Sequence, residues 1–300
     1  MRVRGSPIGI ICHGGAGTIN DKQAAAEGLE EAIGQSYRLL RQSADAMQAV
    51  VAAVRIMEDN PVFNCGTGSN LTVEGRAEMD AAVMTQDGRF GGVCCITDVK
   101  NPILVAEKVM TETDHLLLCG SGAVSFAHKL GFEEFDVITE RSRRRLEKLR
   151  QDGKSPYFPK LEKMMNSGTV GAVAIDKHVK LAVATSSGGI TGRLPGRIGD
   201  SAIMGAGTYA GPSGAVSCTG HGELVIKMML AKDIVERMKT LPASIAVTLG
   251  LSEAKRKKGM CGAVGFDARG GLCFGHTTKD MAYGYMVADR LFMFTKGKKG

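Results

Sequence analysis

The chain has 300 residues, of which 44% are hydrophobic and 23% charged, and its formal net charge is +7. This balance is typical of a folded globular protein and excludes disorder along the whole chain. No stretch approaches the roughly 20 apolar residues of a transmembrane helix, and the N-terminal stretch lacks the features of a secretory signal peptide. We therefore expect one compact unit in the cytoplasm, with no membrane partner.

The first half of the chain has the alternating patterns of strands and helices. Its clearest boundary signal is Asp45 with Gln48 three residues later, which predicts a capping box. The sequence Asn60-Pro61 then ends the helix, because the residue before proline avoids helical geometry. In chain order we expect a strand at 8–12, helices at 22–42 and from 45 to about 58, strands at 80–84 and 92–97, a helix from 101, a strand at 115–119 and a helix at 121–130.

The second half contains two predicted hairpins. Residues 176–178 separate two β-rich runs, and residues 267–270 form a second turn of suitable composition. Hairpins imply antiparallel sheets, so the predicted class is α/β (α+β), with sheets packed face to face and helices outside. The expected elements are strands at 170–175, 179–185 and 214–218, helices at 222–238 and 243–256, and strands at 262–266 and 272–276.

Most of the positive charge is concentrated between the two halves. Residues 141–163 carry nine Lys and Arg residues against three acidic residues, a net +6. With its glycine and prolines, we interpret the stretch 141–167 as a flexible, solvated basic linker. A nucleic-acid-binding arm is the alternative, and it would make the chain a basic binding protein without turnover.

The cysteines indicate neither a metal site nor a disulfide framework. There are eight, without CxxC spacing, and most lie in apolar runs where a thiol behaves as a small hydrophobic group. This pattern suits a reducing compartment. Signatures of other enzyme classes are missing as well, including GxSxG, HExxH and a correctly placed GxGxxG.

A candidate nucleophile lies where the basic stretch meets a buried strand. In the sequence NSGTVG (166–171), Thr169 opens that strand and Gly168 precedes it. A threonine hydroxyl needs a base, and its own α-amine, with a pKa of about 7.7, suits proton transfer at neutral pH. That amine exists only after the Gly168–Thr169 bond is cut. An ordinary strand start is the other interpretation of this short motif.

Further motifs resolve this choice, because in order and spacing they resemble the plant-type asparaginases and isoaspartyl peptidases of the N-terminal-nucleophile (Ntn) hydrolases. The resemblance covers nearly the whole chain. It rests on HGGAG (13–17), NPVFNCGTGS (60–69), EMDAAVM (78–84), GTVGAVAID (168–176), TSSGG (185–189), PGRIGDS (195–201), GAG (205–207) and CTGHGE (218–223).

The resemblance implies a four-layer αββα sandwich of two antiparallel sheets flanked by helices. It also implies self-cleavage into an alpha subunit (1–168) and a beta subunit (169–300), which together form one structural domain, and a dimer of such cleaved pairs. The implied activity is hydrolysis of L-asparagine and of isoaspartyl dipeptides, with no nucleic-acid partner.

The resemblance assigns the site residues as follows. Thr169 is the nucleophile, Ser187 supports it, and Thr219 with Gly220 forms an oxyanion hole. Substrate contacts come from Asn64, Arg197, Asp200, Gly220 and Gly222. Arg197 and Asp200 could offer a fork for the carboxylate of a free amino acid and an acceptor for its ammonium group. On sequence alone a surface ion pair is the other interpretation, and the resemblance favours the substrate clamp.

No cofactor is expected for catalysis, but a structural sodium ion is. The resemblance places it in a loop whose ligands are mainly backbone carbonyl oxygens, which suit a hard monovalent cation. Two histidines attract attention, and we interpret His13 as structural, whereas His221 is a candidate for facing the leaving group. The loop residues assigned to sodium are Met57, Glu58, Asn60, Phe63, Cys65 and Thr67.

One departure from the family concerns Ser187, where relatives commonly have threonine. Serine keeps the hydroxyl but loses the methyl group that restricts its rotamer. Serine here also occurs in the taspase-like branch, although Asp200 and the absence of a very long insertion argue against that branch. A glycosylasparaginase is the other enzymatic alternative, but aspartate rather than Gly168 commonly precedes its threonine.

Overall fold

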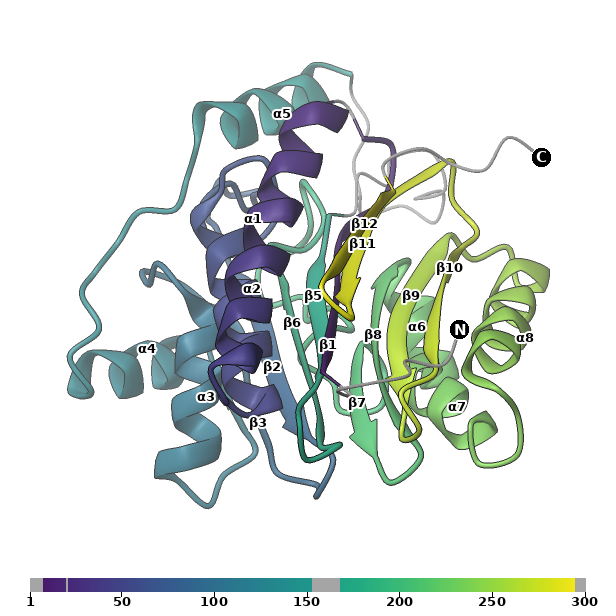
Figure 1. The fold of residues 1–300 in the computed structure, drawn as a ribbon. Coiled ribbons are helices and arrows are strands. Elements are labelled where there is room, and N and C mark those ends of the chain that lie inside the picture. Colours follow the sequence, from purple (N-terminus) through teal and green to yellow (C-terminus); the bar gives the residue numbers. More distant parts are fainter. Residues whose placement is uncertain (1–7, 20, 153–167, 295–300) are drawn as a thin grey trace.

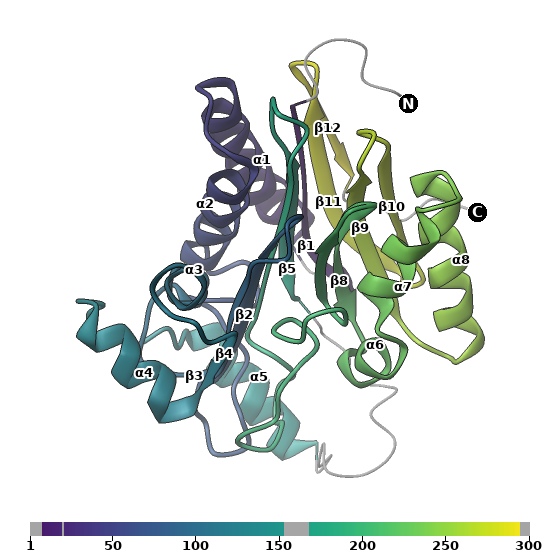
Figure 2. The same cartoon turned by 90° about the horizontal axis from the view of Figure 1, so that it is seen from below.

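The computed structural model describes residues 8–19, 21–152 and 168–294. Two β-sheets pack face to face, and a layer of helices covers the outer face of each one (Figure 1). Turning the molecule by 90° shows the same four layers from below (Figure 2). The predicted class, two sheets flanked by helices, is confirmed, and the layering is consistent with an Ntn-hydrolase sandwich.

Eight strands form the larger sheet, in the order β12-β11-β1-β5-β6-β2-β3-β4. Strand β1 lies between β5 and β11, so parts of the chain on both sides of residue 168 share one sheet. The neighbours are antiparallel except for β3 and β4, which are parallel, so the expectation of a wholly antiparallel sheet was wrong at this edge. The strands are β1 (Gly9–Gly17), β2 (Met79–Thr85), β3 (Phe90–Ile96), β4 (Leu117–Cys119), β5 (Val170–Ile175), β6 (Leu181–Ser187), β11 (Asp280–Val287) and β12 (Arg290–Phe294).

The smaller sheet is antiparallel throughout its four strands, in the order β10-β9-β8-β7. Its strands are β7 (Thr208–Gly211), β8 (Gly214–Gly220), β9 (Cys261–Asp267) and β10 (Leu272–His276). The helices of the two outer layers are α1 (Lys22–Arg41), α2 (Ala46–Asp59), α3 (Pro102–Glu112), α4 (Gly120–Lys129), α5 (Glu140–Gln151), α6 (Gly222–Met228), α7 (Leu230–Arg237) and α8 (Ala243–Arg256).

Three apolar clusters fill the spaces between the four layers. One joins α1 and α2 to the larger sheet and includes Leu29 and Val50. The second, with Ile11 and Phe266, lies between the sheets. The third joins the smaller sheet to α7 and α8 and includes Ile234. Burial of both faces explains why strands such as β5 are apolar at every position, without the alternation of a half-exposed strand.

The basic stretch differs most from its prediction. Residues 141–151 are not a flexible linker but belong to α5, which Thr139 and Ser142 begin with a reciprocal capping box. Leu146 and Leu149 are buried, so the helix packs one stripe against the protein despite its charge. Residues 153–167, the remainder of the predicted linker, lie outside the described residues.

Other element predictions need smaller changes. The helix expected over 222–238 is two helices, because Met229 adopts a left-handed conformation (φ 48°) between α6 and α7. Strands β7, β11 and β12 were not predicted. The capping box of Asp45 and Gln48 is confirmed. All eight cysteines are free thiols, and no helix in the described parts of the chain is long and apolar enough to cross a membrane.

Candidate active site

Thr169 lies directly before β5 and is almost completely buried. Its Oγ1 donates a hydrogen bond to Ser187 Oγ at 3.0 Å. Ser187 ends β6, and its Oγ also accepts the backbone N–H of Gly189 at 3.0 Å. The backbone therefore orients the serine hydroxyl, which compensates for the missing threonine methyl group.

Asn64 lies beside the peptide bond that precedes Thr169. A Cβ atom on Gly168 would be 2.7 Å from Asn64 Cβ. A larger residue at position 168 would therefore force either its own backbone or Asn64 to shift. The Asn64 amide is held at both ends: Nδ2 donates to Gly189 O at 2.8 Å, and Oδ1 accepts from Asn70 N at 2.7 Å. Asn64 thus connects its own loop with the turn after β6.

Arg197, Asp200 and Gly222 lie close together. A Cβ atom on Gly222 would lie 2.7 Å from Arg197 Nη2 and 2.9 Å from Asp200 Oδ1. Only glycine leaves room between the two charged groups. We call these three residues the clamp.

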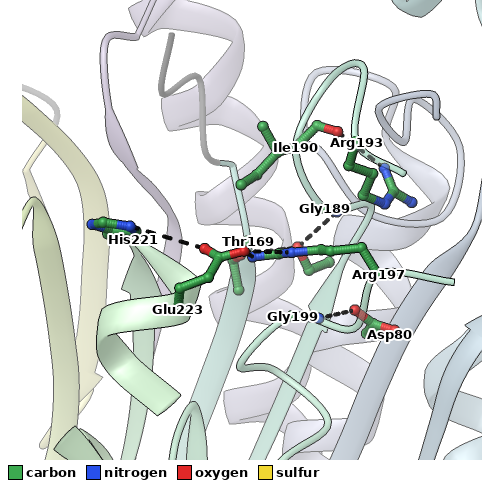
Figure 3. A network of polar contacts seen from close by, with 10 residues as sticks. Asp80, Thr169, Gly189, Ile190, Arg193, Arg197, Gly199, His221 and Glu223 are labelled. Atoms are coloured by element: carbon green, nitrogen blue, oxygen red, sulfur yellow. Dashed lines mark hydrogen bonds and ion pairs between the residues drawn. The ribbon is translucent and has the colours of Figure 1, made fainter. Parts of the chain in front are cut away.

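The guanidinium group of the clamp already has a carboxylate partner. Arg197 Nε and Nη2 lie 2.9 and 2.8 Å from Glu223 Oε1, and His221 lies on the other side of Glu223 (Figure 3). Arg197 is largely buried, whereas the Glu223 side chain is half-exposed. His221 therefore faces Glu223, 4.0 Å from Nε2 to Oε2.

Asp80 connects the clamp to the nucleophile. It is opposite Ser187 in the β2–β6 register, and its Oδ2 accepts the N–H of Gly199 at 2.8 Å (Figure 3). Gly199 immediately precedes Asp200. Burial raises the pKa of the Asp80 carboxyl group. Through its bond to Gly199, Asp80 holds the loop before Asp200 near the end of β6, where Ser187 contacts Thr169.

Burial also controls the ionisation of Asp200. It raises the pKa of this carboxyl to about 7, although the nearby Arg197 opposes the shift. Its buried Oδ2 has no hydrogen-bond partner in the described parts of the chain. A buried acceptor without a donor is costly, and an ammonium group would satisfy it.

Thr219 and Gly220 end β8, on the sheet that faces β1 and β5. Thr219 is completely buried, and its Oγ1 accepts the N–H of Ala16 at 3.3 Å. Gly220 has φ +125°, and a Cβ there would be 2.1 Å from Met260 O. Glycine is required here because the backbone before β9 passes so closely.

His13 lies in the interface between the sheets. Its Nε2 and the Oγ of Ser217 are 2.9 Å apart, and Thr185 Oγ1 lies 2.9 Å from the same Ser217 oxygen. Burial lowers the pKa of His13 to about 3, against an opposing contribution from the Thr169 backbone. A neutral, hydrogen-bonded histidine of this kind suits the structural role favoured from the sequence.

The loop expected to hold sodium is tightly curled and rich in carbonyl oxygens. Met57 O, Glu58 O and Asn60 O accept backbone N–H groups of the same loop at 3.3, 2.8 and 3.2 Å. Met57 O also accepts from Cys65 Sγ at 3.4 Å, whereas a carbonyl oxygen with one hydrogen bond, such as Glu58 O or Asn60 O, has a second lone pair that suits a monovalent cation. The Glu58 side chain, whose pKa burial raises to about 8, instead accepts from Ser186 Oγ at 2.6 Å. The loop also contains the remaining residues assigned to sodium, Phe63, Cys65 and Thr67.

Sequence reasoning missed several polar residues of this region. Glu223 and Asp80 stand inside the quoted motifs, so a search for carboxylates beside the clamp arginine would have found them. Arg193, buried and donating to the carbonyl groups of Asn70 and Ile190, had no such signal. Within the described residues, no group of three or more His, Cys, Asp or Glu side chains is placed to hold a metal.

The four-layer fold is consistent with an Ntn-hydrolase sandwich, and comparison with known proteins gives the family. Residues 6–295 match the asparaginase family. A plant-type L-asparaginase of Thermococcus kodakarensis is 43% identical over 92% of this chain and 95% of its own. That of Pyrococcus furiosus is 42% identical, covering 93% and 96%. An isoaspartyl peptidase/L-asparaginase of Homo sapiens is 39% identical, covering 86% of each.

The chain therefore belongs to the asparaginase family. It is a hydrolase, and its family supports amidohydrolase activity.

Proposed function

We propose that this protein cuts itself between Gly168 and Thr169, and then hydrolyses L-asparagine and isoaspartyl dipeptides with Thr169 as nucleophile. The observation that carries the proposal is the 3.0 Å hydrogen bond from Thr169 Oγ1 to Ser187, which Asp80 connects with the clamp. Relatives named plant-type L-asparaginase and isoaspartyl peptidase/L-asparaginase give the substrates.

Self-cleavage begins when Thr169 Oγ attacks the carbonyl carbon of Gly168. The C–N bond breaks as the acyl group moves from nitrogen to oxygen, and the nitrogen takes up a proton. Water then hydrolyses the ester, which frees the Thr169 hydroxyl and leaves a carboxylate on Gly168. The products are the fragments 1–168 and 169–300, and the second begins with the amine that catalysis needs.

In turnover, the Thr169 amine accepts the hydroxyl proton while Oγ attacks the side-chain amide carbon of the substrate. Thr219 and Gly220 stabilise the negative charge that develops on the carbonyl oxygen. The amine gives its proton to the leaving nitrogen, and the C–N bond breaks. Water then releases aspartate from the acyl-enzyme.

The clamp holds the substrate's backbone during these steps. Arg197 pairs with the α-carboxylate of the substrate when Glu223 turns away. The Asp200 carboxylate, whose Oδ2 has no partner among the described residues, accepts the α-ammonium group. Gly222 lets both groups approach, and Asn64 borders the reacting bond. A substrate without a free amine and carboxylate loses these contacts.

No cofactor is proposed for the chemistry. We propose a structural sodium ion on the carbonyl oxygens of the loop that ends at Thr67, where it would stiffen the chain around Asn64. We also propose self-association into a dimer of cleaved pairs, and a cytoplasmic location that suits the free thiols.

The nucleic-acid-binding alternative loses support in the described part of the basic stretch. Arg141 donates to the carbonyl groups of Val62 and Phe63, and Arg145 donates to Asn70. Both arginines are thus partly buried against the candidate site. A surface for phosphates would need them in solvent.

The Thr169→Ala variant tests the proposal. It lacks both the hydroxyl and the catalytic amine group of a threonine terminus, so we expect one uncut chain of 31.7 kDa and loss of amide hydrolysis by at least about 10³-fold. The measurement is intact mass together with ammonia release from asparagine. Normal processing of this variant would contradict the assignment of the nucleophile.

A further inference from the structure

A cavity of about 240 Å³ borders Gly168. Its wall includes the glycines at the end of β1, Asn64, and Arg141 and Arg145 from α5. We call it the Gly168 cavity. The sequence assigned roles to Asn64 and Gly168 but none to the two arginines, and the clamp residues do not line the cavity.

The two arginines bring positive charge to this cavity, and no carboxylate of the described residues pairs with either of them. In the described parts of the chain neither has a carboxylate partner, since Arg141 donates to Val62 O and Phe63 O at 2.8 and 2.9 Å and Arg145 donates to Asn70 Oδ1 at 3.3 Å. Burial lowers the pKa of both guanidinium groups. A buried cation held only by neutral acceptors is stabilised by an incoming anion.

Among the described residues of the cavity wall, the one acidic residue is already hydrogen-bonded. Asp21 is the N-cap of α1, where its Oδ1 accepts the N–H of Ala24 at 2.9 Å. Arg141 is engaged as well, because both of its terminal nitrogens hold the loop before Asn64. Arg145 makes a single long hydrogen bond to the described residues, at 3.3 Å, so it has donors left for a ligand.

The chemistry places the leaving group on this side of Thr169. In turnover the Thr169 amine protonates the leaving nitrogen, so that nitrogen must come within hydrogen-bond distance of Thr169 N. Before self-cleavage, Thr169 N is bonded to Gly168. The clamp holds the acyl part of the substrate, so the leaving group extends into the space beside Gly168, which is the cavity.

We propose that the Gly168 cavity binds the leaving amino acid of isoaspartyl dipeptides, and that Arg145 pairs with its free carboxylate. This inference rests on the proposed function. Arg145 would then be a second specificity determinant of the site, besides the clamp. It would favour short substrates that carry a carboxylate one residue beyond the cleaved bond. Asparagine releases ammonia, which carries no carboxylate, and so gains nothing from Arg145.

The experiment compares three substrates: β-aspartyl-glycine, its C-terminal amide, and asparagine. For the natural protein we expect kcat/KM to be about 10-fold or more higher for the acid than for the amide, because charge-assisted hydrogen bonds contribute that much. In Arg145→Ala this preference disappears, mainly through a higher KM for the acid. Asparagine is the internal reference, and Arg145→Lys should restore part of the preference.

Arg144→Ala is the matched control. It removes a cation from the same helix, but its side chain is 75% exposed and pairs with Glu140 at 2.8 Å. We expect the acid-to-amide ratio to be unchanged in this variant. Fragment formation by each variant reports whether it folds.

Three results would overturn the inference. If the natural protein does not distinguish acid from amide, or if Arg145→Ala keeps the preference while it still cleaves asparagine, the cavity is not the carboxylate site and the proposed function stands. If the natural protein forms no fragments and hydrolyses none of the three substrates, the proposed function and this inference both fail.

Discussion

Thr169 stands between two basic regions that are built differently. In the clamp, Arg197 has a carboxylate partner in Glu223, and Gly222 packs against its guanidinium group. In the Gly168 cavity, Arg141 and Arg145 contact only neutral acceptors among the described residues. The clamp is therefore a preorganised region that selects one chemical group, whereas the Gly168 cavity, of about 240 Å³, has arginine donors available for a leaving group.

Removing Arg197 from the clamp should lower kcat/KM more than removing Arg145 from the Gly168 cavity. For Arg197→Ala we expect kcat/KM for asparagine to fall by about 10²-fold or more, since a partly buried charge pair with the substrate is lost. Self-cleavage should continue, because the Gly168–Thr169 bond does not depend on the clamp. Steady-state kinetics and fragment yield measure the two effects.

Arg143 is an exposed arginine on α5, and Arg143→Ala provides the control for loss of a positive charge. If Arg197→Ala lost processing and turnover to the same degree, Arg197 would be a folding residue and the contrast between the two regions would disappear.

The pKa of Asp200 predicts a pH dependence that belongs to the clamp alone. Because burial raises this pKa to about 7, the carboxylate is charged above that pH and neutral below it. We expect the natural protein to bind the product L-aspartate more tightly than Asp200→Asn does at pH 8. This advantage should shrink by about 10-fold per pH unit below 7.

Inhibition constants of L-aspartate for both proteins between pH 5 and 8 provide the measurement. Using their ratio removes the titration of the Thr169 amine, which both proteins share. A ratio that stays constant over this range would mean that Asp200 keeps an ordinary carboxyl pKa and that its burial does not affect recognition.

The smallest effect is expected at Ser187. Ser187→Thr should cleave itself at least as fast as the natural chain, because a β-branched residue restricts χ1 and keeps its hydroxyl toward Thr169. The N–H of Gly189 already orients the serine, so any gain should be only about two- to threefold. Gel time courses of fragment formation compare the two proteins. Slower processing would show that the pocket has closed around serine, at a cost of about 1–3 kcal/mol for overpacking.

Most of the architecture could be predicted because local signals and burial agree. The capping box at Asp45 and the turn at Asp267 are specified by neighbouring residues, and both are observed. Helix α5 was missed because its charge obscured a buried stripe of Ser142, Leu146 and Leu149. The break at Met229 is a left-handed conformation unusual for that residue, which local sequence does not reveal.

In the candidate site, too, some contacts could be predicted from the sequence and others could not. Motif order was enough to bring Arg197, Asp200 and Gly222 together, since their glycine-rich loops resemble those of a known family. It did not indicate that Glu223 occupies the fork of Arg197, nor that Arg141 and Arg145 turn toward Gly168. Contacts of this kind join residues far apart in the chain, as Arg141 contacts Val62, 79 positions away, and only the packed layers decide them.

Intact mass and N-terminal sequencing of the purified natural protein test the central claim most directly. The account predicts that the 31.7 kDa chain becomes two fragments, with a new N-terminus at Thr169. A chain that remains uncut under conditions in which it hydrolyses asparagine, or a cut at any other bond, would contradict it.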